Sequence, residues 1–92
     1  MSKLCKRNHL YEGEAVALDE IMIPDRTIER IMRKDFAQIE KMREDFENDR
    51  PYVRVVLRRV CGGYVISDGR HRVIAAKLAG LAWIEAKVIG DE

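Results

Sequence analysis

The sequence is poor in cysteine, proline and aromatic residues, and it has no long apolar run. Of 92 residues, two are cysteine, two are proline and 7% are aromatic. Two cysteines, Cys5 and Cys61, are too few for a disulfide-stabilised scaffold, so we expect free thiols. No apolar run approaches the roughly 18 residues that span a bilayer. We therefore expect a soluble, cytoplasmic protein with no membrane partner.

The N-terminal segment also lacks the pattern of a secretory signal, because its basic residues are not followed by an apolar stretch. Residues 1–14 are polar and show no periodicity, which predicts a flexible N-terminal arm. Residues 15–92 are then numerous enough for one small domain. The chain is 47% hydrophobic and 36% charged, a composition typical of globular and not of disordered proteins.

The net charge is only +1, but the charge is unevenly distributed. Residues 50–72 contain six arginines and one acidic residue, Asp68, for a local balance of +5. The near-neutral total argues against a protein that coats nucleic acid, whereas the local cluster favours a site for a compact anion. Arg54 and Arg58 lie on one face of a predicted strand and are candidates for an anion groove. A solvated strand face is the alternative for this pair.

The first half of the domain predicts a strand followed by a long helix. Residues 15–24 read as a short strand that has a turn near Asp19 and stops at Pro24. Asp35, followed by Gln at the third position, has the form of an N-cap and indicates a kink near Lys34. Apolar residues at helical spacing predict one stripe, assigned to the core or to the face of a homodimer: Ile28, Ile31, Met32, Phe36, Ile39, Met42 and Phe46. The helix should end before Pro51.

The second half predicts a hairpin, a helix and a closing strand. Residues 52–60 alternate, with Val53, Val55 and Leu57 on the buried side, and a glycine turn at 61–63 leads into a returning strand. A helix from about residue 71 should bury one face and end at a left-handed Gly80. That face comprises Ile74, Lys77, Leu78 and Leu81. Residues 83–89 form the last strand, with Ile84, Ala86 and Val88 inward. The fold class is therefore α+β: a mixed sheet packed against helices in the order β-α-β-β-α-β.

The segment with the most informative chemistry is the turn between the returning strand and the second helix. Its residues are Ser67-Asp68-Gly69-Arg70-His71-Arg72. A helix N-terminus offers free backbone N–H groups and a positive dipole end, and glycine lets the main chain come close to a ligand. Cations here oppose the dipole, but a bound phosphate would satisfy the dipole and the guanidinium groups together. The alternative is an ordinary N-cap at Asp68 with the arginines extended into water.

Residues 64–81, with the following Ile84-Glu85-Ala86-Lys87-Val88, resemble the ParB/sulfiredoxin superfamily. The family pattern is a strand, an Asp-Gly-x-His-Arg or Gly-x-Arg-Arg turn, an Ala-Ala helix, Gly-Leu and a closing strand. The stretch 17–24 is similar to the family's first strand and turn, so the resemblance covers roughly residues 15–90. In relatives the turn binds the phosphates of CTP, in ParB proteins, or of ATP or ADP, in sulfiredoxin and free-standing serine kinases.

The resemblance implies that Gly69, His71 and Arg72 bind phosphate, that Asp68 precedes them as in the kinase form, and that Arg70 belongs to the same turn. The implied cofactor is a nucleoside di- or triphosphate with Mg²⁺. Sulfiredoxin has its nucleophilic cysteine where this chain has Arg70, so the chain lacks the thiol that reduction of sulfinic acids requires. The kinases place a catalytic glutamate soon after the proline of the first strand, where this chain has Asp25.

The residues leave three functions open. The first is a nucleotide-binding or regulatory module, as found in mobile elements, that holds its ligand at residues 69–72. The second is a small ATP- or ADP-dependent phosphotransferase, in which Asp68 would hold Mg²⁺ or orient the acceptor and Asp25 would be the base. An ordinary acidic residue at a helix start is the alternative for Asp25. The third is a DNA-binding accessory protein of a partition or regulatory system, whose arginines would contact backbone phosphates. No His, Cys, Asp and Glu set has the spacing of a metal site, so no resident metal is expected.

Overall fold

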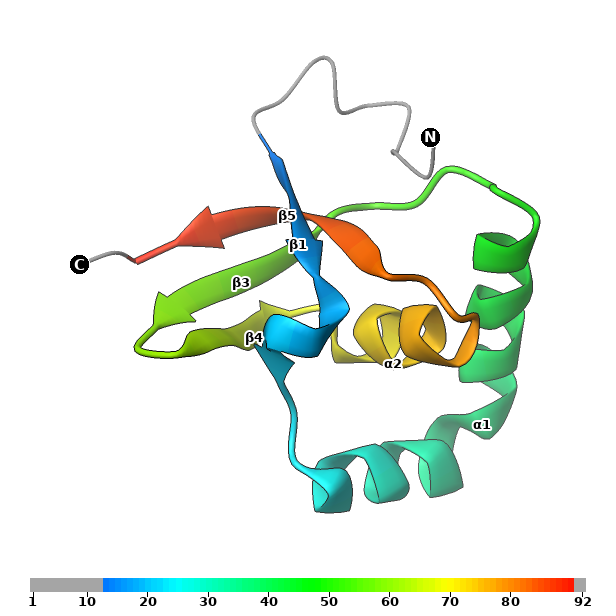
Figure 1. The fold of residues 1–92 in the computed structure, drawn as a ribbon. Helices are drawn as coiled ribbons and strands as arrows, with labels where there is room; N and C mark the ends of the chain where they lie inside the picture. Colours follow the sequence, from blue (N-terminus) through cyan, green and yellow to red (C-terminus); the bar gives the residue numbers. More distant parts are fainter. Residues whose placement is uncertain (1–12, 91–92) are drawn as a thin grey trace.

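The computed structural model describes residues 13–90, which form a mixed five-stranded sheet with two helices (Figure 1). In chain order the elements are β1 (Glu14–Ala17), a 3-10 turn (Leu18–Glu20), β2 (Ile21–Met22), α1 (Asp25–Glu47), β3 (Val55–Val60), β4 (Gly63–Asp68), α2 (Arg70–Leu78) and β5 (Trp83–Ile89). The α+β class and the order β-α-β-β-α-β are confirmed, with the first strand interrupted by the 3-10 turn. Residues 1–12 of the predicted arm lie outside the described residues, and Glu14 already belongs to β1.

The sheet order is β1-β5-β3-β4-β2, so the two halves of the interrupted first strand lie at opposite edges. β3 and β4 form the predicted antiparallel hairpin, and β5 returns beside β3 in the parallel direction. β1 pairs antiparallel with β5, and β2 pairs parallel with β4. The crossover from β4 to β5 contains α2, which therefore begins at the end of β4 and lies against the sheet.

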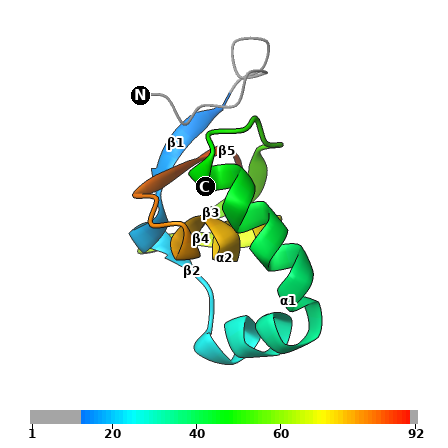
Figure 2. The same cartoon turned by 90° about the vertical axis from the view of Figure 1, so that its right-hand side faces the viewer.

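The core lies between the sheet and the two helices, and α1 packs across α2 (Figure 2). Its largest fully buried side chains are Ile39, Leu57, Ile74, Ile84, Val55 and Val73. In α2 the four consecutive residues 73–76 are buried, whereas Lys77 and Leu78 are exposed. The predicted face of α2 was wrong at these two positions, because this helix is covered by the sheet on one side and by α1 on the other. No helix within residues 13–90 is long and apolar enough to cross a membrane.

A kink divides α1 at Asp35, whose φ of −123° and ψ of 38° are not helical. The kink near Lys34 is thus confirmed, and so is the end of the helix before Pro51. The predicted stripe was wrong at one position, since Phe36 is 54% exposed while Ile39 is fully buried. The non-helical residue resets the angular phase of the helix, and therefore the stripe does not run through the residue that follows the kink.

The strands follow the prediction with one shift. β5 spans the expected residues, and Ile84 and Ala86 are fully buried. β3 begins at Val55, three residues later than the expected start at residue 52, so Val53 lies in the preceding loop and is 54% exposed. Gly80 has the expected left-handed conformation, with φ of 82°, at the end of α2.

Glu85 is an unexpected charged residue in the interior of β5, where it is only 4% exposed. Its backbone N–H donates a hydrogen bond of 3.0 Å to the hydroxyl of Tyr52. Burial raises the pKa of its carboxyl above the usual value, the charge of Arg54 acts in the opposite direction, and Glu14 adds repulsion. The ionised carboxylate is therefore a cost to the folded state.

A pH-dependent gain in stability is expected for Glu85→Gln. Because the folded-state pKa is raised, the stability contributed by the protonated carboxyl is present below the unfolded pKa of about 4.5 and is lost as the pH rises through the folded value. The neutral amide avoids this loss. The free energy of unfolding of the variant, relative to that of the wild type, should therefore increase between about pH 4 and pH 7. Urea unfolding at the two pH values measures the difference. Glu44→Gln, an exposed change on α1, is the control, and an equal shift in both variants would contradict the assignment.

Candidate functional site

The candidate site is built on the turn between β4 and α2. β4 ends at Asp68 and α2 starts at Arg70, so Gly69 alone connects them and is the N-cap of the helix. Gly69 has φ of 110° and ψ of 29°, a left-handed conformation that glycine adopts without a steric penalty. No side chain of residues 13–90 caps this end of α2, and the backbone N–H of Val73 makes the first helical bond to the carbonyl of Gly69 at 3.0 Å. The amides of the first turn therefore remain available to an anion.

Gly69 also lies directly against β3. A Cβ atom at this position would come within 2.7 Å of Cγ1 of Val55, which is fully buried. Because Val55 cannot move without disturbing the core, the main chain at residue 69 needs glycine for both its conformation and its surroundings. This close approach determines where α2 begins and therefore where its first side chains lie.

A hollow of about 260 Å³ lies over the turn. All six residues from Ser67 to Arg72 line it, together with Ile66 of β4 and with Gln38 and Met42 from the second half of α1. The structure thus brings together the five predicted binding residues, 68–72, at one cavity. Gln38 and Met42 were not predicted as site residues: the helical spacing placed Met42 in the core stripe, and no local signal marks Gln38.

Among the residues that line this hollow, Arg72 has a buried polar atom whose hydrogen-bonding capacity is not satisfied. Its Nε is buried and has no hydrogen-bond partner in the part of the chain that the structure describes. Its Nη2 lies 3.7 Å from Oδ2 of Asp68, a carboxylate that is itself 75% exposed. A buried donor without an acceptor is costly, and Arg72 lines the hollow, so its guanidinium group is a candidate partner for an anion there.

His71 contacts a residue of α1 that the sequence did not indicate as a site residue. Its Nε2 lies 2.9 Å from Oδ2 of Asp35, and the two side chains are 32% and 33% exposed. The prediction for Asp35 was a helix N-cap, and the structure directs its carboxylate to His71. The kink in α1 therefore supplies one partner of an interhelical pair.

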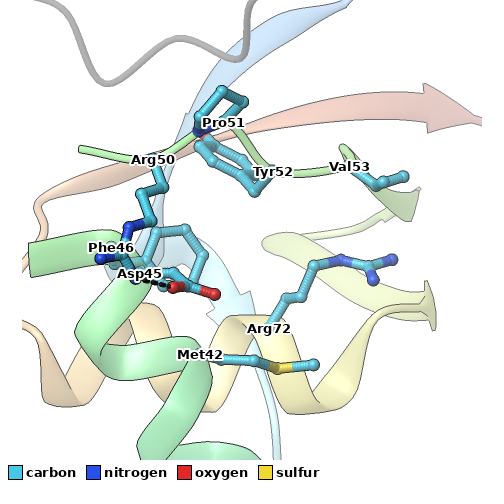
Figure 3. A pocket seen from close by; sticks show the side chains of 8 residues that line it. All are labelled: Met42, Asp45, Phe46, Arg50, Pro51, Tyr52, Val53 and Arg72. Atoms are coloured by element: carbon cyan, nitrogen blue, oxygen red, sulfur yellow. Dashed lines mark hydrogen bonds and ion pairs between the residues drawn. The ribbon is translucent and has the colours of Figure 1, made fainter. Parts of the chain in front are cut away.

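A second hollow, of about 170 Å³, lies beside the first and shares two of its residues, Met42 and Arg72 (Figure 3). Its other lining residues are Asp45, Phe46, Arg50, Pro51, Tyr52 and Val53. The rings of Phe46 and Tyr52 pack with centroids 4.9 Å apart, and Arg50 donates a hydrogen bond of 2.7 Å to Asp45. Arg72 thus stands between a polar hollow over the turn and a hollow with mainly apolar and aromatic walls.

Three predicted residues lie elsewhere. Asp25 is the first residue of α1, is exposed, and lines neither hollow. The charge of Arg54 lowers the pKa of Glu85, and Arg58 lies against Gly90. Neither arginine of the predicted groove lines either hollow. No group of three or more His, Cys, Asp or Glu residues suited to a metal ion occurs within residues 13–90.

Cys61 lies far from this site along the sheet. It is an exposed free thiol in the turn that precedes β4, whereas the candidate site follows β4. Cys5 lies outside the described residues. The structure thus places Cys61 away from the turn, where Arg70 occupies the position expected of a sulfiredoxin nucleophile.

Solved structures of two other proteins share this fold. Sulfiredoxin from Arabidopsis thaliana matches with a TM-score of 0.67 and 21% identity, over 88% of each chain. The C-terminally truncated chromosome-partitioning protein ParB from Caulobacter crescentus, complexed with CTP-γ-S, matches with a TM-score of 0.66 and 19% identity. That match covers 89% of this chain and 46% of the ParB chain, so the chain spans less than half of that protein.

The chain therefore has a ParB/sulfiredoxin-like fold, as its sequence resemblance predicted. No protein-family model and no curated protein matches the sequence.

Two glycine substitutions separate the backbone requirement at the turn from the steric one. Gly62 also has a positive φ, of 89°, but no atom lies within 4 Å of the position of its Cβ. Gly62→Ala should therefore lower the free energy of unfolding by about 1–2 kcal/mol, the cost of a left-handed residue. Gly69→Ala should lower it by about 1–3 kcal/mol more, because its Cβ overpacks Val55. Urea unfolding of both variants tests this, and equal losses would mean that the contact with Val55 is unimportant.

Proposed function

We propose that this ParB/sulfiredoxin-like domain binds a nucleoside di- or triphosphate, with the phosphates at the turn formed by residues 69–72. The observation that carries the proposal is Arg72: its Nε is buried without a hydrogen-bond partner among residues 13–90, and its Nη2 lies near Gly69, the N-cap of α2. Free amides and a guanidinium group then converge on one hollow. A phosphate is the ligand that satisfies both, through oriented N–H groups and through charge-assisted hydrogen bonds.

The second hollow favours a nucleotide over inorganic phosphate. A ligand with an anionic end in the first hollow would extend past Arg72 towards Phe46, Tyr52 and Val53 (Figure 3). Apolar and aromatic walls beside a few polar groups are typical of sites for planar organic ligands. The nucleotide in the ParB complex is consistent with this class of ligand.

Asp68 is the residue of this turn that would hold Mg²⁺ on the bound phosphates. Its carboxylate is largely exposed at the rim of the first hollow, and Mg²⁺ usually binds through one or two carboxylates together with phosphate oxygens. The residues fit such a shared ion better than a resident metal, since no cluster of ligands is present within residues 13–90. Binding is therefore best measured with and without Mg²⁺.

The arginines of residues 50–72 do not favour the DNA-binding function. Arg50 is paired with Asp45, and Arg59 lies over the ring of Tyr64 at 5.5 Å. Arg72 belongs to the two hollows, whereas Arg58 lies against Gly90. The local charge of +5 is thus divided among separate positions. Binding of duplex DNA is therefore a weaker candidate function for this domain than nucleotide binding.

Arg72→Ala should weaken binding of ATP, CTP and tripolyphosphate alike, by about tenfold or more. A hydrogen bond to a charged group contributes roughly 1.5–3 kcal/mol, and 1.4 kcal/mol corresponds to a factor of ten. Isothermal titration calorimetry at constant salt gives the three affinities. Arg58→Ala is the control because it removes the same charge from β3 outside both hollows. A larger loss in the control would move the site to the predicted groove.

Val53→Ser should weaken nucleotide binding roughly fivefold while leaving tripolyphosphate binding unchanged. Val53 lines only the second hollow and is exposed, so its loss removes about 1 kcal/mol of apolar contact with the base without affecting the core. Leu78→Ser is the matched control, an exposed aliphatic residue outside both hollows. Equal losses for nucleotide and tripolyphosphate would contradict the assignment of the second hollow.

A further inference from the structure

The contact between His71 and Asp35 joins two residues that are 36 positions apart in the chain. Asp35 is the non-helical residue of α1, and His71 is in the first turn of α2. His71 lines the hollow over the phosphate turn, whereas Asp35 does not. His71 therefore lines the hollow proposed for the ligand and also has its ring nitrogen Nε2 on a carboxylate of α1.

This contact assigns the roles of the two ring nitrogens. A carboxylate accepts hydrogen bonds, so at 2.9 Å the proton lies on Nε2 of His71, which donates to Asp35. In the neutral ring Nδ1 then has a lone pair and no proton. Neutral His71 in this tautomer cannot donate a hydrogen bond to a phosphate oxygen, so within the turn the backbone amides and Arg72 would bind the phosphates. The ring of His71 can instead accept a proton from a hydroxyl group or from water.

We infer that Asp35 positions His71 as the proton acceptor for hydrolysis of the nucleotide bound at the turn. This inference rests on the proposed function. A water molecule attacks the terminal phosphorus, and Nδ1 of His71 takes its proton as the new P–O bond forms. The bond from that phosphorus to the bridging oxygen breaks, and its electron pair leaves with the shortened nucleotide. Inorganic phosphate and the protonated imidazole are the other products, and the imidazolium then returns its proton to solvent.

The arrangement is that of a base held by a carboxylate, in which the carboxylate selects the tautomer and the ring orientation. Asp35 is here a positioning residue, because it does not line the hollow. Each side chain is about one third exposed, which leaves water access to the ring. The packing of α1 on α2 holds both partners, so the base is prepared before ligand binds.

The activity test compares phosphate release from ATP and CTP in the presence of Mg²⁺. His71→Gln should lower kcat about 100-fold or more, the usual contribution of a general base. Asp35→Asn should lower kcat at least tenfold, since the amide no longer enforces the tautomer. Both variants should bind nucleotide within about threefold of the wild type. Asp19→Asn, the same chemical change at an exposed residue of the 3-10 turn, should leave kcat unchanged.

A second readout does not depend on turnover. Long-range ¹H–¹⁵N NMR spectra at about pH 8.5, where a free imidazole is neutral, report the tautomer of His71. The wild type should show the proton on Nε2, and Asp35→Ala should show a mixture of both tautomers. A proton on Nδ1 in the wild type would overturn the inference.

The outcomes distinguish the two proposals. Absence of nucleotide binding by the folded wild type would overturn the proposed function, and the inference with it. Binding without hydrolysis, or hydrolysis that is unchanged in Asp35→Asn, would overturn the inference alone. A parallel loss of affinity and kcat in Asp35→Asn would show that the pair serves only to hold the helices together, and would likewise overturn it.

Discussion

The close approach of Gly69 to Val55 is the contact on which the candidate site depends. With Val55 buried in β3, the chain can leave β4 and enter α2 only through a residue without a side chain. The left-handed conformation of Gly69 then lets α2 begin directly after β4, so that its first residues line the hollow. The proposed anion site therefore depends on one steric constraint in the core, because the same contact that anchors α2 to the sheet positions its N-terminus.

The second half of α1 contributes the remaining residues around the turn. Gln38 and Met42 form the opposite wall of the first hollow, and the kink directs Asp35 to His71. Basic side chains at a helix N-terminus oppose the helix dipole. Here two of them have acidic partners, since Arg72 lies near Asp68 and His71 contacts Asp35. The basic charge of the turn is thus partly neutralised, while the buried Nε of Arg72 has no hydrogen-bond partner within residues 13–90.

The sequence by itself determined the features that depend on near neighbours in the chain. The hairpin, the kink before Phe36, the end of α1 before Pro51 and the left-handed Gly80 follow from local rules of turn, cap and periodicity. The motif of residues 67–72 also indicated the fold and the candidate binding residues, because a strand, a glycine and a basic helix start are contiguous. Such signals persist in any tertiary arrangement that keeps the same elements.

Only the tertiary structure decided which side chains of different elements meet. The sequence could not show that Asp35 contacts His71, that Glu85 is buried, or that Arg72 separates two hollows. It also misplaced Phe36 and Leu78, because the periodicity of one helix does not say how many neighbours cover it. These contacts depend on the kink angle of α1 and on its packing across α2. Both are set by interactions between residues distant in sequence, for which no local pattern exists.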